Sequence, residues 1–184
     1  MSTLTIELPV QKDQTSFNLR RWAEVLADPE LTRFEGRIET DRHGQIIMSP
    51  PPAFSHGGFQ FEIGYLLRTL LPGGRTVTEC PISTADGVRA ADVVWISHAK
   101  LAAIGENICL TKAPEICVEI LSPKNTRAEM AEKKALYFAA GAREVWFCNK
   151  GNMTFFCRAN SSGELVSRFC RDFPRRVEPD RPDK

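Results

Sequence analysis

Apolar residues follow two spacings along the chain, and each spacing predicts a different kind of element. A spacing of three or four residues, which places side chains on one face of a helix, predicts helices over 16–27, 55–71 and 126–140, with a shorter one over 100–104. Residues that can cap the longer helices stand at their starts: Ser16, Ser55, and Asn125 or Thr126.

Shorter apolar runs separated by turn-forming residues predict strands. These strands are 33–40, 45–49, 75–83, 88–96, 115–121, 144–148, 153–158 and 164–170. The order of elements predicts an α/β fold, with a central mixed β-sheet flanked by helices and an added N-terminal helix and hairpin. We expect one domain over residues 16–175, a flexible arm at 1–15 and a flexible tail at 176–184, in a Pro-, Arg- and Asp-rich stretch that begins at Arg171.

Two of the predicted strands contain a carboxylate in an apolar run. Asp92 stands at the start of an apolar run, after Ala91 and before Val-Val-Trp, and Glu119 lies between a valine and an isoleucine. An ionised carboxylate buried without a partner is costly, so a chain with such residues often holds a metal or another cation there. The structural alternatives are a pair between Asp92 and Arg89, and a core ion pair between Glu119 and Lys133 or Arg127.

These residues have the chemistry of a metal site for phosphodiester hydrolysis. Such a site needs hard oxygen ligands for Mg²⁺ or Mn²⁺ and a cation near the scissile phosphate. Asp92 and Glu119 can supply two ligands, and the backbone carbonyl of Ile120 can supply a third. Lys133, on the helix after the Glu119 strand, can supply the cation, whereas Lys134 beside it is expected to point into water.

Composition narrows the class of protein. The 184 residues are 42% hydrophobic with a net charge of +1, so no overall positive field indicates a nucleic-acid partner, although a local basic rim would suffice. The chain has no signal-peptide pattern and no apolar run near the roughly 18 residues of a membrane span, which predicts a cytoplasmic protein. The six cysteines form no Cys-x-x-Cys pair, which predicts reduced structural thiols, and the three tryptophans are predicted to lie in the core.

The order and spacing of these residues resemble a known family. Asp92 is followed by Glu119-Ile-Leu-Ser-Pro and then by Glu129-x-x-x-Lys133-x-x-x-Tyr137-x-x-x-Gly141-x-x-Glu144-Val-Trp146. Upstream stand Arg37-Ile38-Glu39, Gly44-Gln-Ile-Ile-Met48-Ser49-Pro50 and His56. This string, over roughly residues 16–175, is similar to the Uma2 family of the PD-(D/E)xK nuclease superfamily, and the whole string is far more specific than any single piece.

The resemblance implies a restriction-endonuclease-like core in which Asp92 and Glu119 bind Mg²⁺ or Mn²⁺ and Lys133 assists. It also implies that Glu39 belongs to the catalytic group, although a hairpin glutamate is often exposed to solvent. His56 is a weaker candidate for binding substrate, because a histidine can hydrogen-bond phosphate or act as a base; its alternative role is to help begin a helix.

The chain departs from the superfamily pattern at two positions. Ala91 stands where the superfamily has a proline, which takes no part in the chemistry. Leu121 stands where the motif lysine is expected, two residues after Glu119. The family places a lysine on the following helix instead, at the position of Lys133.

The resemblance implies an endonuclease that hydrolyses DNA, acting as a homodimer because cleavage of both strands is simplest with a two-fold pair of sites. Two other functions stay open. Leu121 favours a non-catalytic module that binds nucleic acid or protein on the same fold. A metal-dependent hydrolase of a phosphorylated small molecule would use the same ligands but would need a deep, closed pocket.

Overall fold

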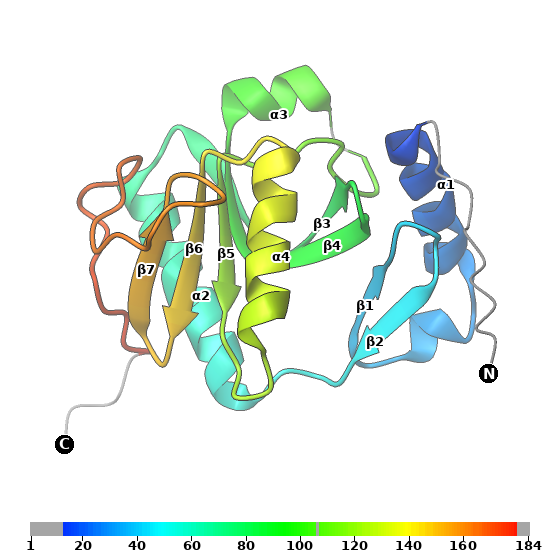
Figure 1. The fold of residues 1–184 in the computed structure, drawn as a ribbon, viewed down its shortest axis with the longest axis horizontal. Coiled ribbons are helices and arrows are strands. Elements are labelled where there is room, and N and C mark those ends of the chain that lie inside the picture. The colour runs from blue at the N-terminus through cyan, green and yellow to red at the C-terminus, as the bar shows by residue number, and fades with distance from the viewer. Residues whose placement is uncertain (1–12, 106, 180–184) are drawn as a thin grey trace, which may run out of the picture.

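A five-stranded mixed sheet with a helix on each face forms the centre of the molecule, whose computed structural model describes residues 13–105 and 107–179 (Figure 1). The strands, in spatial order, are β3 (Gly74–Thr84), β4 (Gly87–Ser97), β5 (Ile116–Ile120), β6 (Glu144–Asn149) and β7 (Asn152–Phe156). β5 and β6 are parallel, and every other neighbouring pair is antiparallel. The predicted α/β fold with a mixed central sheet is confirmed.

Two helices cover opposite faces of this sheet (Figure 1). α2 (Phe54–Leu70) packs Ile63 and Leu67 against one face, and α4 (Arg127–Ala139) packs Tyr137 against the other. Thr126 caps α4 in a capping box with Glu129, as one of the two predicted caps. The short helix α3 (His98–Ile104) follows β4 directly.

The N-terminal helix and hairpin dock beside the first half of β4. They comprise α1 (Gln14–Ala27), the 3₁₀ turn Leu31–Arg33, β1 (Arg37–Thr40) and β2 (Ile46–Ser49). β5 pairs with β4 only at 93–95, so the earlier N–H groups of β4 have no strand partner on that side. Side chains of β1 replace the missing strand, because Ala90 N donates to Glu39 Oε1 at 2.8 Å and Val88 N donates to Thr40 Oγ1 at 3.0 Å.

Element boundaries differ from the predictions mainly at helix starts. Asp13, not Ser16, caps α1, because the Asp13 carboxylate accepts from the Ser16 N–H at 3.1 Å. α2 begins at Phe54 with Ala53 as its N-cap, so Ser55 lies inside the helix. The first predicted hairpin strand, 33–40, begins only at Arg37, because residue 33 ends the 3₁₀ turn and residues 34–36 are irregular.

The predicted strand over 164–170 is wrong. The described chain has only a single bridge there, between Phe155 and Glu164. The buried carboxylate of Glu144 accepts from the N–H groups of Arg168 and Phe169 at 2.7 and 2.9 Å. These backbone groups are therefore used by a side chain rather than by a neighbouring strand.

The stretch after Arg171 is packed, up to Pro179, rather than loose as expected. Phe173 and Val177 are buried in the main core. Val177 N donates to the Gly151 carbonyl at 2.9 Å, and a Cβ at Gly151 would lie only 2.4 Å from the Val177 carbonyl oxygen, so this close approach requires glycine. The other parts of the predicted arm and tail, 1–12 and 180–184, lie outside the described residues.

Three smaller predictions concern the core and the membrane. The three tryptophans are buried, at 7%, 5% and 0% exposure, as predicted for Trp22, Trp95 and Trp146. All six cysteines are free thiols, and all but Cys157 are buried. Across the described residues, the helices are too short or too polar to cross a membrane.

Candidate active site

The first predicted ligand, Asp92, lies where the β3–β4 ladder is interrupted. The pairing runs to Thr78 with Val93 and resumes at Cys80 with Ala91, so the intervening pair of Glu79 and Asp92 is missing. Glu79 has a φ of 49°, a left-handed conformation that is costly for a residue with a side chain. Such strain persists only where the surrounding contacts impose it, and it often accompanies a functional site.

Asp92 is 1% exposed and is held by three groups. Its Oδ2 accepts from the Ile120 N–H at 2.5 Å, and its Oδ1 contacts Arg37 Nη2 and lies 3.2 Å from His56 Nε2. Burial alone would raise the pKa of Asp92, but the contacts with His56 and Arg37 outweigh it and lower the pKa. Asp92 is therefore an ionised carboxylate inside the protein, and in turn it raises the pKa of His56.

The predicted alternative for Asp92, a pair with Arg89, is wrong. Arg89 contacts Asp86 and lies 3.7 Å from Glu39 instead. The alternative also assumed that Asp92 is a solvated residue at a strand end, but Asp92 is buried in the middle of β4.

Glu119 lies on β5 and points toward α4. It is 4% exposed, accepts from the Tyr137 hydroxyl at 2.6 Å and lies 3.3 Å from Lys133 Nζ. Burial raises the pKa of Glu119 to about 7, although Lys133 opposes this effect. Burial alone would lower the pKa of Lys133, but the facing carboxylates of Glu119 and Glu39 raise it, so the ammonium stays charged.

Glu39 is buried, not exposed on a wet face of the hairpin as its alternative assumed. It is 6% exposed, and its Oε1 lies 3.2 Å from Lys133 Nζ. Lys133 therefore bridges a carboxylate of the hairpin and a carboxylate of the sheet. Its neighbour Lys134, which was expected to point into water, is partly exposed, and its Nζ lies 4.2 Å from the centre of the Phe156 ring.

Four further residues complete the site and were missed as candidates: Arg37, Gln60, Glu79 and Tyr137. Arg37 Nη2 and Nε each lie 2.8 Å from a carboxylate oxygen of Glu79, and Gln60 Nε2 donates to Glu79 at 2.5 Å and to the Asp92 carbonyl at 3.1 Å. Tyr137 stands four residues after Lys133, on the same helix face, and this spacing is a signal that was present in the sequence. Arg37 likewise stands two residues before Glu39 on one strand face.

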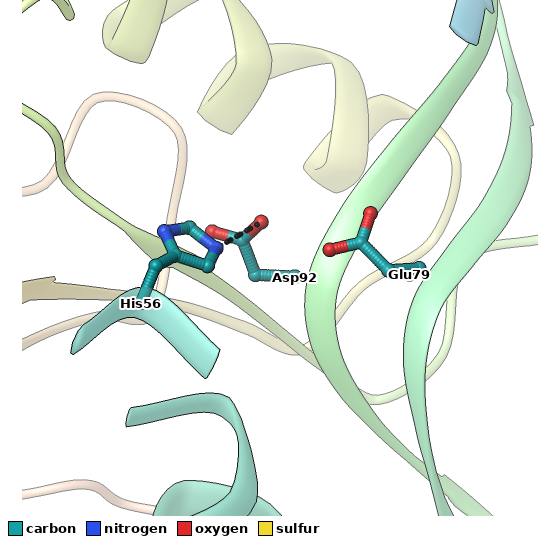
Figure 2. Close-up of side chains that lie close together, drawn as sticks. All are labelled: His56, Glu79 and Asp92. Atoms are coloured by element: carbon teal, nitrogen blue, oxygen red, sulfur yellow. Dashed lines mark ion pairs between the residues drawn. The ribbon is translucent and has the colours of Figure 1, made fainter. Parts of the chain in front are cut away.

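Metal-ligating side chains gather around Asp92. Among the described residues, the possible ligand atoms of His56, Glu79 and Asp92 all lie within 4.8 Å of one another. Figure 2 shows the His56 ring beside the Asp92 carboxylate, with Glu79 approaching from the neighbouring strand. Glu119 is not part of this group, and Ile120 contacts Asp92 through its N–H, so a ligand role for the Ile120 carbonyl stays a prediction.

Leu121, at the position of the motif lysine, lines an open hollow beside the start of α4. The hollow measures about 490 Å³, and Met130, Lys134 and Phe147 also line it. Leu121 directly follows the last residue of β5, and Met130 and Lys134 in this hollow belong to α4, the helix that also contacts Glu119.

Comparisons with known proteins agree with this architecture. The family model Uma2, described as "Putative restriction endonuclease", matches residues 22–181. Among solved structures, the chain is similar to a "putative nuclease belonging to DUF820 from Anabaena variabilis ATCC 29413", with 20% identity and a TM-score of 0.63 over 79% of this chain and 83% of that one. At this identity the likeness shows the fold alone. No curated protein matches the chain.

Proposed function

This chain belongs to the Uma2 family, and from that premise we propose that it is a metal-dependent endonuclease that hydrolyses DNA phosphodiester bonds. The family description and the nuclease fold of the structural neighbour support a nuclease. The observation that carries the proposal is the pair of buried carboxylates on adjacent strands, Asp92 on β4 and Glu119 on β5, with the Lys133 ammonium beside the second.

Asp92 and Glu119 would hold Mg²⁺ or Mn²⁺, with the Ile120 carbonyl as a further ligand. Their chemistry fits such an ion, because both offer the hard oxygen atoms that these cations prefer and both lie in a buried site. When bound, the ion would act as a Lewis acid on a phosphate oxygen and would lower the pKa of a bound water. Glu119, with a pKa of about 7, ionises near neutral pH and becomes competent to bind.

Lys133 stabilises the negative charge that develops on the phosphate. Its ammonium lies 3.2 Å from Glu39 and 3.3 Å from Glu119, so two carboxylates keep it protonated and in place. A fixed charge in a partly buried site stabilises a transition state better than a mobile one. Glu39 therefore acts by positioning Lys133, and His56, beside Asp92, is within reach to hydrogen-bond a bound phosphate.

Cleavage of supercoiled plasmid tests this proposal. The purified protein is incubated with plasmid in Mg²⁺, in Mn²⁺ and in EDTA, beside the variants Asp92→Asn and Glu119→Gln and the control Lys134→Ala. We expect nicking or linearisation that needs metal and falls by about 10²–10³-fold or more in both site variants. Full activity in folded Glu119→Gln protein would refute the assignment of the site.

Two observations favour the alternative of a non-catalytic binding module. Arg37 and Lys133 already neutralise Asp92 and Glu119, and Leu121 stands in place of the motif lysine. A module of this kind would bind DNA with equal affinity with and without Mg²⁺ and would cleave in neither condition. Fluorescence polarisation with labelled duplex measures this affinity on the same protein samples.

We also propose that the enzyme acts as a homodimer, so that two sites face the two strands of DNA. Sedimentation of the protein alone and with a short duplex measures the oligomeric state. A protein that stays monomeric in both conditions and yields only nicked plasmid would contradict the dimer without affecting the chemistry of the site.

A further inference from the structure

The guanidinium of Arg37 lies between two carboxylates that face each other across β3 and β4. Its Nη2 contacts Asp92 Oδ1 and lies 2.8 Å from Glu79 Oε1, while its Nε lies 2.8 Å from Glu79 Oε2. The side chain is only 17% exposed. An internal cation, carried by the hairpin, therefore satisfies both carboxylates of the sheet.

A histidine of α2, His56, faces the same two carboxylates. His56 Nε2 is buried and lies 3.2 Å from Asp92 Oδ1, with which it forms an ion pair. The His56 nitrogen and the oxygens of Glu79 and Asp92 lie within 4.8 Å of one another (Figure 2). One imidazole and two carboxylates form a donor set for a divalent transition ion such as Mn²⁺.

We propose that Arg37 and a divalent cation compete for this position, and that His56, Glu79 and Asp92 are the ligands of the ion that displaces Arg37. The inference rests on the proposed function, because Asp92 is common to this position and to the one assigned to Asp92 and Glu119. It adds two ligands from α2 and β3 and a second ion position to the site.

Displacement gives Arg37 a second role. The side chain is long, and its planar guanidinium presents paired N–H donors that match the oxygen atoms of a phosphate. Once the ion occupies the carboxylates, the guanidinium is free to bind the phosphate of a substrate. Loading of the ion and binding of the phosphate are thus coupled through one residue of the hairpin.

Binding of Mn²⁺ alone to the full chain tests the exchange. Free Mn²⁺ is measured by electron paramagnetic resonance during titration of the wild type, Arg37→Gln, Arg37→Lys, Glu79→Gln and His56→Gln. We expect Arg37→Gln to bind Mn²⁺ about tenfold more tightly than the wild type, with Arg37→Lys between them. We expect Glu79→Gln and His56→Gln to bind at least about tenfold more weakly.

The matched control is Arg89→Gln. Arg89 is similarly buried, at 12% exposure, but it contacts Asp86 and Glu39 rather than Asp92 and Glu79. Loss of its charge should change Mn²⁺ affinity by less than about threefold, since the contribution of a charge that does not contact the ligands is small. An Arg37→Gln affinity no tighter than that of Arg89→Gln would overturn the exchange.

A second readout identifies the histidine directly. Pulsed electron paramagnetic resonance of bound Mn²⁺ should show coupling to a ring nitrogen that disappears in His56→Gln. Wild-type affinity in Glu79→Gln and His56→Gln, with weak binding only in Glu119→Gln, would overturn the inference and leave the proposed function standing. The reverse failure is also distinct, because tight binding through His56 and Glu79 without cleavage would support this ion position and refute the nuclease. Thermal unfolding of each variant establishes that it is folded.

Discussion

Glu119 and Glu144 are buried carboxylates on the neighbouring strands β5 and β6, and the protein holds them in opposite ways. Glu144 is 3% exposed and accepts from four neutral donors. These donors, at 2.6–2.9 Å, are the indole of Trp146, the hydroxyl of Ser167 and the N–H groups of Arg168 and Phe169. Glu119 is 4% exposed and accepts from one neutral donor, the Tyr137 hydroxyl, and faces the ammonium of Lys133.

The difference separates a structural carboxylate from one that is available to a ligand. Two of the four donors to Glu144 are backbone groups, which cannot leave without unfolding of the segment that they belong to. The partners of Glu119 in the described structure are the side chains of Tyr137 and Lys133, and Lys133 is 20% exposed, so a metal ion can reach this carboxylate without unfolding of the backbone. A carboxylate held only by side chains is open to a bound ion, whereas one held by backbone groups is not.

The largest expected effect concerns Lys133, the charged partner of Glu119. Lys133→Ala should reduce plasmid cleavage by about 10²–10³-fold, because it removes the only ammonium beside Glu119 in the described structure. Lys134→Ala is the matched control, since Lys134 lies over the Phe156 ring and should change cleavage by less than about twofold.

A relocated lysine sharpens the same test. In Lys133→Ala with Leu121→Lys, the new ammonium stands at the motif position, beside α4, the helix that contacts Glu119. We expect this double variant to cleave plasmid at least about tenfold faster than Lys133→Ala, because the position of the charge matters more than the residue that carries it. Equal activity of Lys133→Ala and Lys134→Ala would show that neither lysine assists the reaction.

The second effect concerns stability at the structural carboxylate. Glu144→Gln replaces two acceptor oxygens by one acceptor and one NH₂ donor. The NH₂ group cannot accept from the N–H groups that point at this side chain. Leaving buried donors unsatisfied should cost about 2–3 kcal/mol and lower the melting temperature by about 4–12 °C. Differential scanning calorimetry measures this change, and a melting temperature within about 2 °C of the wild type would contradict the structural role of Glu144.

The third effect is a dependence of stability on pH that belongs to Glu119. Burial raises the pKa of Glu119 from 4.5 to about 7, so the folded state holds this proton more tightly than the unfolded state does. The resulting stability is present below pH 4.5 and is lost as the pH rises through about 7. Glu119→Gln cannot ionise, so without metal it should melt about 2–8 °C above the wild type at pH 8, with a much smaller difference at pH 5.

The comparison with Glu144 makes this experiment specific. Only Glu119→Gln should raise the melting temperature at pH 8, because Glu144→Gln is expected to lower it. Added Mn²⁺ should reverse the order of the wild type and Glu119→Gln, since an ion that binds only the folded wild type stabilises it. A Glu119→Gln variant that melts below the wild type at pH 8 in EDTA would show that its partners more than offset the cost of burial.

The sequence alone indicated the central fold because its elements have strong local patterns. The apolar spacing of α2 and α4 and the apolar runs of β4 and β5 need no distant contact to be recognised. The segment over 164–170 was mistaken for a strand because its structure depends on Glu144, some twenty residues earlier, and such a contact leaves no periodic mark. Phe173 and Val177 were assigned to a loose stretch because proline and charge dominate the local composition there.

The same distinction applies to the site. Asp92 and Glu119 were recognisable because a carboxylate in an apolar run conflicts with its surroundings, and such conflicts often mark function. Arg37, Gln60 and Glu79 meet only because the hairpin and α2 dock against β3 and β4. The left-handed backbone at Glu79 adds a feature that its residue type does not suggest, since glycine is the usual residue at positive φ.

The smallest expected effect comes from removing the one neutral donor to Glu119. Tyr137→Phe keeps the buried ring but deletes the hydroxyl that lies 2.6 Å from the carboxylate. Burial is the main cause of the raised pKa of Glu119, and the hydroxyl opposes it, so its loss should move the pKa further up. The acid limb of the pH profile of cleavage should therefore shift to higher pH by less than about one unit.

At high pH, where Glu119 is ionised in both proteins, Tyr137→Phe should retain activity within about fivefold, the size of one net hydrogen bond. Rates measured from pH 5.5 to 9 at saturating Mn²⁺ separate the two effects. A uniform loss above about 10²-fold at every pH would mean that the hydroxyl contacts the substrate itself. The expected shift without a uniform loss would mean that Tyr137 only sets the charge of Glu119, and that the carboxylate, unlike Glu144, keeps its function when its last fixed donor is gone.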